Sequence, residues 1–218
     1  MTTGTPTRRR PHELVLLGGF ASLGVLAGST AKAADESGIA WAAALGSDPP
    51  AWVLAVALIG RYAPTPARAA GRAAVFFAAM TVAYYAWAVL VLGFGYEPGL
   101  IVAWLALSAT AVAAVAAVSC WATRRTGVAA GALVGLVAGT ALVGGALRRL
   151  YLWWDGTAGA EALQPVQMVA EVVAVLVITL FLPLHRSTRL WALALTLPLW
   201  WLADLAIQEG LYGTGVIR

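Results

Sequence analysis

The sequence contains few of the side chains from which metal and cofactor sites are built. It has one cysteine, two histidines, one lysine and no asparagine, and 11% of its residues are charged. A single cysteine, Cys120, excludes an internal disulfide and a cysteine-based metal site. The charged fraction is well below the roughly 25% of an ordinary soluble domain, so a soluble globular fold is disfavoured.

Several motifs of known chemistry are also absent. The sequence contains no G-x-x-x-x-G-K-[ST] and no G-x-G-x-x-G, and thus no visible nucleotide-binding loop. There is no H-E-x-x-H, and no D-D-x-x-D pair to bind magnesium on a diphosphate, which argues against a prenyltransferase of that type. Lys32, the only lysine, is placed in a loop, which excludes a retinal Schiff base in the last span. We therefore expect no metal and no cofactor.

Apolar residues are abundant instead. Hydrophobic residues make up 61% of the chain and the mean hydropathy is +0.82. A soluble core of this size could not bury them, whereas a bilayer solvates them. The sequence predicts an all-α, polytopic transmembrane helical bundle. The alanine- and arginine-rich usage is typical of a high-GC, actinobacterial genome, so we expect a multi-pass protein of the bacterial plasma membrane.

Seven apolar segments are predicted to cross the membrane. The first also resembles a signal peptide with an Ala31-x-Ala33 cleavage site, so cleavage and an uncleaved first helix both stay open. The second is short unless it begins near Ile39 and breaks at Pro49 and Pro50. Residues 1–13 form a basic N-terminal segment, 14–211 the bundle, 151–165 a loop within it, and 212–218 a tail. The predicted spans are 14–28, 51–62, 73–92, 100–121, 127–147, 166–184 and 190–211.

The distribution of basic residues predicts the orientation. With a cytoplasmic N-terminus, ten basic residues lie inside and four outside, in agreement with the positive-inside rule. The net charge of +4 comes from these helix ends, so it does not indicate nucleic-acid binding. The inside set is Arg8, Arg9, Arg10, Arg61, Arg68, Arg72, Arg124, Arg125, Arg186 and Arg189, and the outside set is Lys32, Arg148, Arg149 and Arg218.

Glycine recurs every fourth residue in the fifth predicted span. The four positions form one smooth stripe along which a neighbouring backbone can approach closely. The stripe could be a homodimer contact or a packing surface inside the same bundle, and the second interpretation is favoured because the bundle must pack its own helices. The stripe consists of Gly127, Gly131, Gly135 and Gly139.

Two carboxylates lie well inside apolar segments, Glu171 in the sixth predicted span and Asp204 in the seventh, whereas a third, Glu209, lies near the end of the seventh. Ionisable groups inside a membrane are costly and commonly functional. Both lie in the outer half of the predicted bundle, on the side where Arg148 and Arg149 end the fifth span. Either acid could pair with one of these arginines and fix helix register, or serve a ligand, proton or substrate. Asp35 and Glu36 lie in the loop on the same side.

Aromatic residues are the second unusual feature, with ten tryptophans in 218 residues. Most of the tryptophans fall near predicted interfaces, where an aromatic belt explains them. Others lie deeper and could stack on a ligand or stabilise a cation, although helix packing explains them too. The deep set is Tyr84, Tyr85, Trp87, Trp104, Trp200 and Trp201.

The first 90 residues resemble an uncharacterised family of small bacterial multi-pass membrane proteins, which implies a fold and no activity. The resemblance is carried by Gly24-Val-Leu-Ala-Gly28, Lys32-Ala-Ala-Asp35-Glu36, Trp41, Leu45-Gly46, Trp52, Ile59-Gly60-Arg61 and Ala83-Tyr84-Tyr85. In size, span number, aromatic content and membrane carboxylates the chain is more weakly similar to the membrane-embedded terpene cyclases. No motif of that family is matched, so it implies no catalytic residue.

Three functions are compatible with these features. An acid-initiated isoprenoid (terpene) cyclase would use Glu171 or Asp204 to protonate an alkene or epoxide, with Tyr84, Tyr85, Trp87, Trp200 and Trp201 along the cation path. The outer position of both acids weighs against it, because isoprenoid substrates are made inside. A transporter, or its substrate-binding subunit, would bind a small solute with Asp35, Glu36, Arg148, Arg149 and Glu171. A structural membrane protein would contact only lipid and protein.

Overall fold

The computed structural model describes residues 10–47, 49–157, 159 and 164–207, and every regular element in them is a helix. The predicted all-α class is therefore confirmed for this part of the chain. The tail 212–218 and residues 1–9 of the basic N-terminal segment lie outside it. The helices are α1 (Arg10–Asp35), α2 (Ala40–Ser47), α3 (Pro49–Tyr62), α4 (Pro66–Leu90), α5 (Pro98–Leu107), α6 (Ala113–Ala122), α7 (Val128–Thr140), α8 (Ala146–Trp154), α9 (Pro165–Leu176) and α10 (Arg186–Ile207).

Short non-α turns modify four of these helices. A π-helical turn, Ser108–Val112, joins α5 to α6, so the two form one continuous rod. A second π-helical turn, Val177–Phe181, extends α9. A 3₁₀ turn, Ala141–Gly144, follows α7. The helical segments that contain α5, α7 and α9 therefore extend beyond the α-helical bounds given above.

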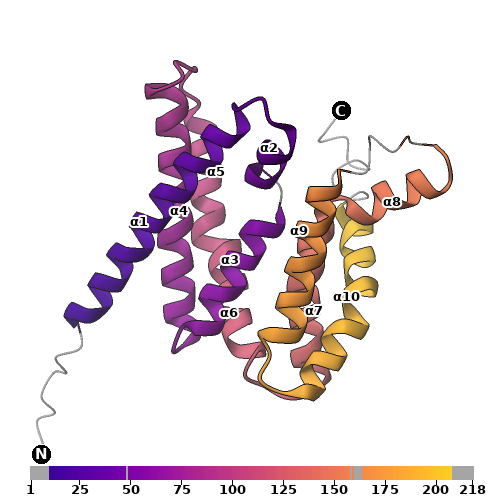
Figure 1. Cartoon of the computed structure of the whole chain (residues 1–218). Coiled ribbons are helices and arrows are strands. Elements are labelled where there is room, and N and C mark those ends of the chain that lie inside the picture. Colours follow the sequence, from indigo (N-terminus) through magenta and orange to yellow (C-terminus); the bar gives the residue numbers. More distant parts are fainter. Residues whose placement is uncertain (1–9, 48, 158, 160–163, 208–218) are drawn as a thin grey trace, which may run out of the picture.

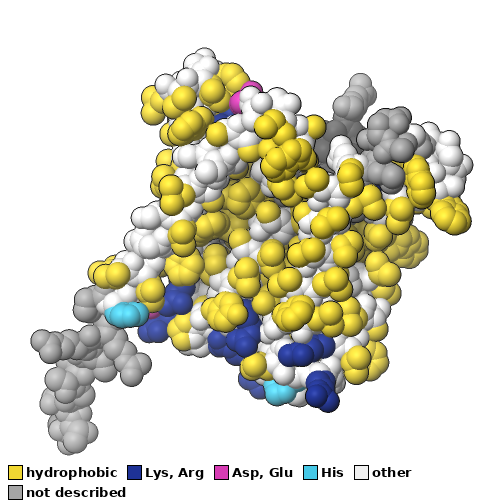
Figure 2. All heavy atoms as spheres, viewed as in Figure 1, with side chains coloured by type: hydrophobic (Ala, Val, Ile, Leu, Met, Phe, Trp, Pro, Cys, Tyr) yellow, Lys and Arg dark blue, Asp and Glu magenta, His cyan; other side chains and the backbone are white. Residues whose placement is uncertain are grey.

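Long helices alternate in direction between two ends of the bundle (Figure 1). The arginine end is where α3 and α6 end and α4, α7 and α10 begin, and Figure 2 shows basic side chains gathered along this lower edge. The acidic end is the opposite one, where α1 and α4 end and α5 begins. The arginine end carries Arg61, Arg68, Arg72, Arg124, Arg125, Arg186 and Arg189, and the acidic end carries Lys32, Asp35, Glu36, Glu97 and Asp155.

Four helices of the described chain are long and apolar enough to cross a membrane: His12–Asp35, Ala40–Tyr62, Pro66–Leu90 and Pro98–Ala122. Val128–Val143 and Leu147–Trp154 would make a fifth span if taken together, although they are bent by 58°. Pro165–Phe181 is apolar but shorter. The chain therefore has several helices suited to a bilayer.

The structure corrects the prediction for residues 127–165. Residues 151–154, predicted as loop, belong to the helix α8, and the helix of the fifth predicted span ends before Leu147. Gly145 causes the break, because its φ of +94° is a conformation that glycine adopts without strain. Arg148 and Arg149 therefore lie on α8, a strongly amphipathic helix that projects sideways at the acidic end (Figure 1).

Prolines and glycines shape the other contacts. The second predicted span can begin near Ile39, as the sequence allowed, because Ala40–Tyr62 is long and apolar enough to be one span, and Pro49 is the first residue of α3. Gly24 and Gly28 let α1 lie directly on α4: a Cβ built at Gly28 would be 2.1 Å from the Met80 carbonyl oxygen, and one at Gly24 2.2 Å from the carbonyl oxygen of Phe76. No side chain fits in that space, so both positions require glycine.

The glycine stripe of α7 faces α10 of the same chain. A Cβ at Gly131 would lie 2.3 Å from Cβ of Trp191, and Gly135 and Gly139 also contact α10 closely. Gly127 precedes α7 with a φ of +101° and has open space around it. A homodimer contact through this stripe stays a prediction, and it would have to displace α10.

Candidate functional site

The structure divides the predicted site residues into two groups at the acidic end. The first group lies where the last turn of α1 meets the last turns of α4. The Lys32 ammonium forms an ion pair with Glu36, with Nζ 2.7 Å from Oε1, and the Tyr84 hydroxyl donates a hydrogen bond to Asp35. Asp35, Glu36, Tyr84 and Tyr85 are thus brought together.

Lys32 is the centre of this group, and its placement corrects the sequence analysis. It was assigned to a loop, but it lies in the last turn of α1 and is only 7% exposed. Its ammonium lies 5.1 Å from the ring centroid of Tyr84 and 4.7 Å from that of Phe94. At these distances both rings stabilise the charge. The i,i+4 spacing of Lys32 and Glu36 was the signal that could have placed the lysine on a helix.

A pocket of about 420 Å³ opens beside this lysine. The segment between α4 and α5 closes one side of it, because Gly93 turns the chain with a φ of +72° and the Phe94 amide bonds the Ala88 carbonyl at 2.9 Å. The volume lies within the range of small-ligand sites, roughly 300–1,000 Å³. The pocket is lined by Lys32, Tyr84, Tyr85, Ala88, Phe94, Gly95 and Glu97.

The second group surrounds Glu171, whose side chain is completely buried on α9. Arg149 of α8 approaches it with Nη2 3.1 Å from Oε1, and Gln167 Nε2 donates to the same oxygen at 3.2 Å. The ion pair that the sequence suggested between this acid and an arginine is therefore present. Within the part of the chain described, Oε1 of the buried Gln167 accepts no hydrogen bond.

The remaining predicted residues lie on α4, α8 and α10. Asp204 is half-buried on α10 and Arg148 is exposed on α8. Trp201 is 56% exposed, and Trp200 packs against Gly139. These tryptophans lie on α10 and the deep aromatics Tyr84, Tyr85 and Trp87 on α4, on opposite sides of the bundle (Figure 1). The aromatic residues therefore do not form the single path that the sequence analysis considered.

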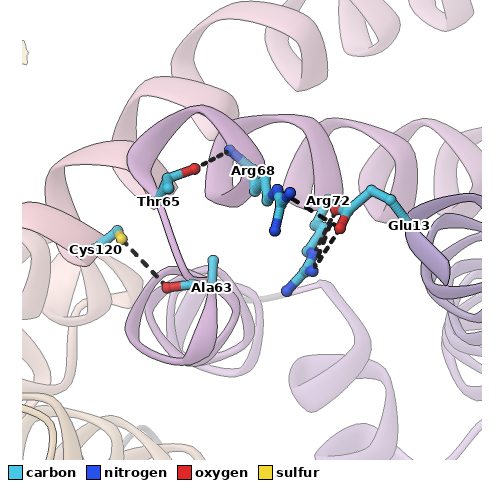
Figure 3. Close-up of polar contacts among 6 residues, drawn as sticks. All are labelled: Glu13, Ala63, Thr65, Arg68, Arg72 and Cys120. Atoms are coloured by element: carbon cyan, nitrogen blue, oxygen red, sulfur yellow. Dashed lines mark hydrogen bonds and ion pairs between the residues drawn. The ribbon is translucent and has the colours of Figure 1, made fainter. Parts of the chain in front are cut away.

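Sequence reasoning missed a third polar cluster, which lies at the arginine end (Figure 3). Glu13, in the first turn of α1, accepts two hydrogen bonds of 3.2 Å from Arg72 of α4, and Arg68 Nε lies 3.7 Å from the same carboxylate. Thr65 accepts a hydrogen bond from the Arg68 amide and begins α4. Glu13 is an acidic residue on the side of the membrane to which the sequence analysis assigned most of the arginines. This position could have indicated that Glu13 pairs with an arginine.

No cluster of three or more His, Cys, Asp or Glu side chains that could hold a metal ion occurs in the described residues. Comparison with protein families, with curated proteins and with solved structures finds no match to this chain. Arguments about function therefore rest on the geometry of the three clusters.

Proposed function

We propose that the chain is a seven-span protein of the bacterial plasma membrane with its arginine end in the cytoplasm. The spans are α1, α3, α4, α5 with α6, α7, α9 and α10, and the alternating direction of these helices supports the count (Figure 1). The arginines at one end support the orientation, since basic residues are retained on the cytoplasmic side. In this arrangement the acidic end and its pocket face outward.

The function that the geometry supports best is binding of a small zwitterionic solute in the outer pocket, as a transporter or the substrate-binding subunit of one. A single observation carries it: a buried ammonium, Lys32, and a carboxylate, Glu97, line the same aromatic-walled cavity of about 420 Å³. An ammonium has three donors, and Glu36 takes one of them at 2.7 Å. A solute carboxylate binds the same ammonium, and a solute cation binds Glu97 and the rings.

The surroundings of Glu171 weigh against this residue, one of the two candidate acids, as the general acid of an isoprenoid cyclase. A general acid must hold a proton before it meets the substrate. The acid must also reach the substrate, whereas the Glu171 side chain is completely buried and its Oε1 accepts from the Arg149 guanidinium at 3.1 Å and from Gln167 at 3.2 Å. In the proposed protein this ion pair holds α8 against α9.

Thermal unfolding of the purified full-length protein in nanodiscs tests the proposal with named probes. Glycine betaine, L-phenylalanine and γ-aminobutyrate carry both charges, whereas acetate and methylammonium each carry one. We expect at least one zwitterion to raise the melting temperature and the two single-charge probes to leave it unchanged. If no zwitterion raises it, the proposal is wrong.

Two variants test whether the solute binds in the outer pocket. Lys32→Met and Glu97→Gln should each weaken binding of the active zwitterion about tenfold, because each removes a charge-assisted hydrogen bond. Arg148→Gln is the matched control, since Arg148 is exposed at the same end and does not line the pocket. Unchanged affinity in Lys32→Met and Glu97→Gln would place the solute elsewhere and reject this site.

A further inference from the structure

A second, smaller pocket lies at the arginine end, away from the proposed solute site. Its volume is about 210 Å³, and it is formed by α1, α3 and α4. Its walls are apolar or aromatic except for one cation. The lining residues are Phe20, Leu58, Ile59, Tyr62 and Arg72.

The cation of this pocket, Arg72, is almost buried, with 8% of its surface exposed. Its guanidinium carbon lies 5.8 Å from the ring centroid of Phe20. Nε and Nη2 donate to Glu13 (Figure 3). A guanidinium has five N–H donors, so these two bonds do not exhaust its capacity.

The local charge is positive even with Glu13 included. One carboxylate faces two guanidinium groups, those of Arg68 and Arg72. A third, that of Arg61, lies 5.5 Å from the ring centroid of Tyr62, another wall of the pocket. An apolar pocket beside uncompensated arginines is suited to a molecule that has a negative head and an apolar tail.

We propose that this pocket binds an anionic phospholipid of the surrounding membrane. The lipid phosphate accepts hydrogen bonds from Arg72 and Arg68, and the acyl chain lies against Phe20, Leu58 and Ile59. Basic pockets between helices on the cytoplasmic side are the usual positions for such headgroups. The apolar walls distinguish a lipid from a free phosphate, which would leave them in contact with water.

Glu13 competes with the phosphate for the same guanidinium groups. Its carboxylate oxygens lie 3.2 Å from Arg72 and 3.7 Å from Arg68. Removing its charge frees donors and raises the positive potential of the pocket. The proposal therefore requires that a variant lacking this charge bind the lipid more tightly than the natural protein does.

Native mass spectrometry of the delipidated full-length protein, titrated with dioleoylphosphatidylglycerol or dioleoylphosphatidylcholine, tests this directly. The natural protein should bind phosphatidylglycerol in preference. Arg72→Gln should weaken that binding about tenfold, through loss of charge-assisted hydrogen bonds to phosphate. Glu13→Gln should strengthen it about threefold by removing the competing charge. The matched control is Arg125→Gln, because Arg125 lies at the same end, stacks on Trp121 and does not line the pocket.

Three outcomes would overturn the proposal. The first is equal binding of both lipids by the natural protein. The second is a Glu13→Gln variant with unchanged or weaker phosphatidylglycerol binding, a measurement that stands even if Arg72→Gln fails to fold. The third comes from competition: soluble glycerol 1-phosphate should not displace the lipid at equal concentration, and if it does, the apolar walls contribute nothing.

Discussion

The two ends of the bundle use charged side chains in different ways. At the arginine end, apart from the cluster around Glu13, guanidinium groups donate to backbone carbonyls: Arg61 Nε to Leu182 at 2.7 Å and Arg189 Nε to Pro183 at 3.0 Å. Arg124 donates to the carbonyl of Arg61 in the last turn of α3 and to those of Ala63 and Pro64 in the segment that joins α3 to α4. At the acidic end, charged side chains bond each other, as in the Lys32–Glu36 pair.

This difference follows from which helix termini meet at each end. Helices α3 and α6, and the extension of α9, finish at the arginine end, and the last carbonyls of a helix have no partner within it. Guanidinium groups satisfy these carbonyls and compensate the negative end of the helix dipole. The arginines that would orient the protein by the positive-inside rule therefore also hold its loops. At the other end the Lys32–Glu36 pair borders the pocket proposed to bind a solute.

The largest expected effect tests whether the acidic end also contains a purely structural pair. Glu171→Ala leaves the Arg149 guanidinium without its buried carboxylate and should lower the free energy of unfolding by about 3 kcal/mol. Glu171→Gln keeps an acceptor for Arg149, so it should lower the free energy of unfolding by less than Glu171→Ala does. Thermal unfolding in detergent measures both, and equal, small losses would show that the pair is not structural.

A smaller effect is expected where the arginines join the loops. Arg124→Gln should lower the free energy of unfolding by about 2 kcal/mol, because carbonyls of residues 61, 63 and 64 lose a charged donor. Arg125→Gln, at the neighbouring position, loses a contact with the Trp121 ring and should cost about 0.5 kcal/mol. If the two variants were equally stable, the arginine end would not depend on carbonyl capping.

The smallest effect concerns Asp155, which follows α8 outside the proposed spans. Two hydrogen bonds from Thr157, from its hydroxyl at 2.6 Å and its amide at 2.9 Å, hold the pKa of this carboxyl below its usual value. A lowered pKa in the folded state stabilises the protein above the ordinary aspartate pKa of about 4, and this contribution is lost as pH falls through the lowered value.

Asp155→Asn should therefore lower the melting temperature slightly at pH 7, and the difference from the natural protein should vanish at about pH 2. Thermal unfolding at both pH values measures it. Thr157→Val is the matched variant, since it removes the hydroxyl donor and keeps the carboxyl. A difference that persisted unchanged in acid would mean that the Asp155 charge is not its cause.

Much of the helical pattern could be predicted from the sequence, because a helix in lipid needs an unbroken apolar run. The close packing at Gly24 and Gly28 follows from the absence of a side chain in glycine. Helix α8 could not be predicted in the same way. Its two adjacent arginines are followed by Leu150 and Tyr151 on an amphipathic helix, which hydropathy alone does not separate from a loop.

The sequence predicted how deep each candidate site residue lies in the membrane, but it did not predict which helices lie next to each other. Hydropathy gives the position of a residue along the membrane normal, so Glu171 and Arg149 were correctly placed on the same side. It does not give which helices are adjacent. For that reason Tyr84 and Trp200 were grouped although α4 and α10 lie apart, and the contact between Glu13 and Arg72 was missed.

The glycine contact between α1 and α4 has a consequence for biogenesis. Helix α1 leaves the ribosome before its docking surface on α4, Phe76 and Met80, which is translated after α2 and α3. Until then α1 is a solitary span whose glycine face is covered by lipid. Bulkier residues at Gly24 or Gly28 would leave membrane insertion of α1 intact and block its later assembly with the bundle. Such variants would be substrates for quality-control proteases.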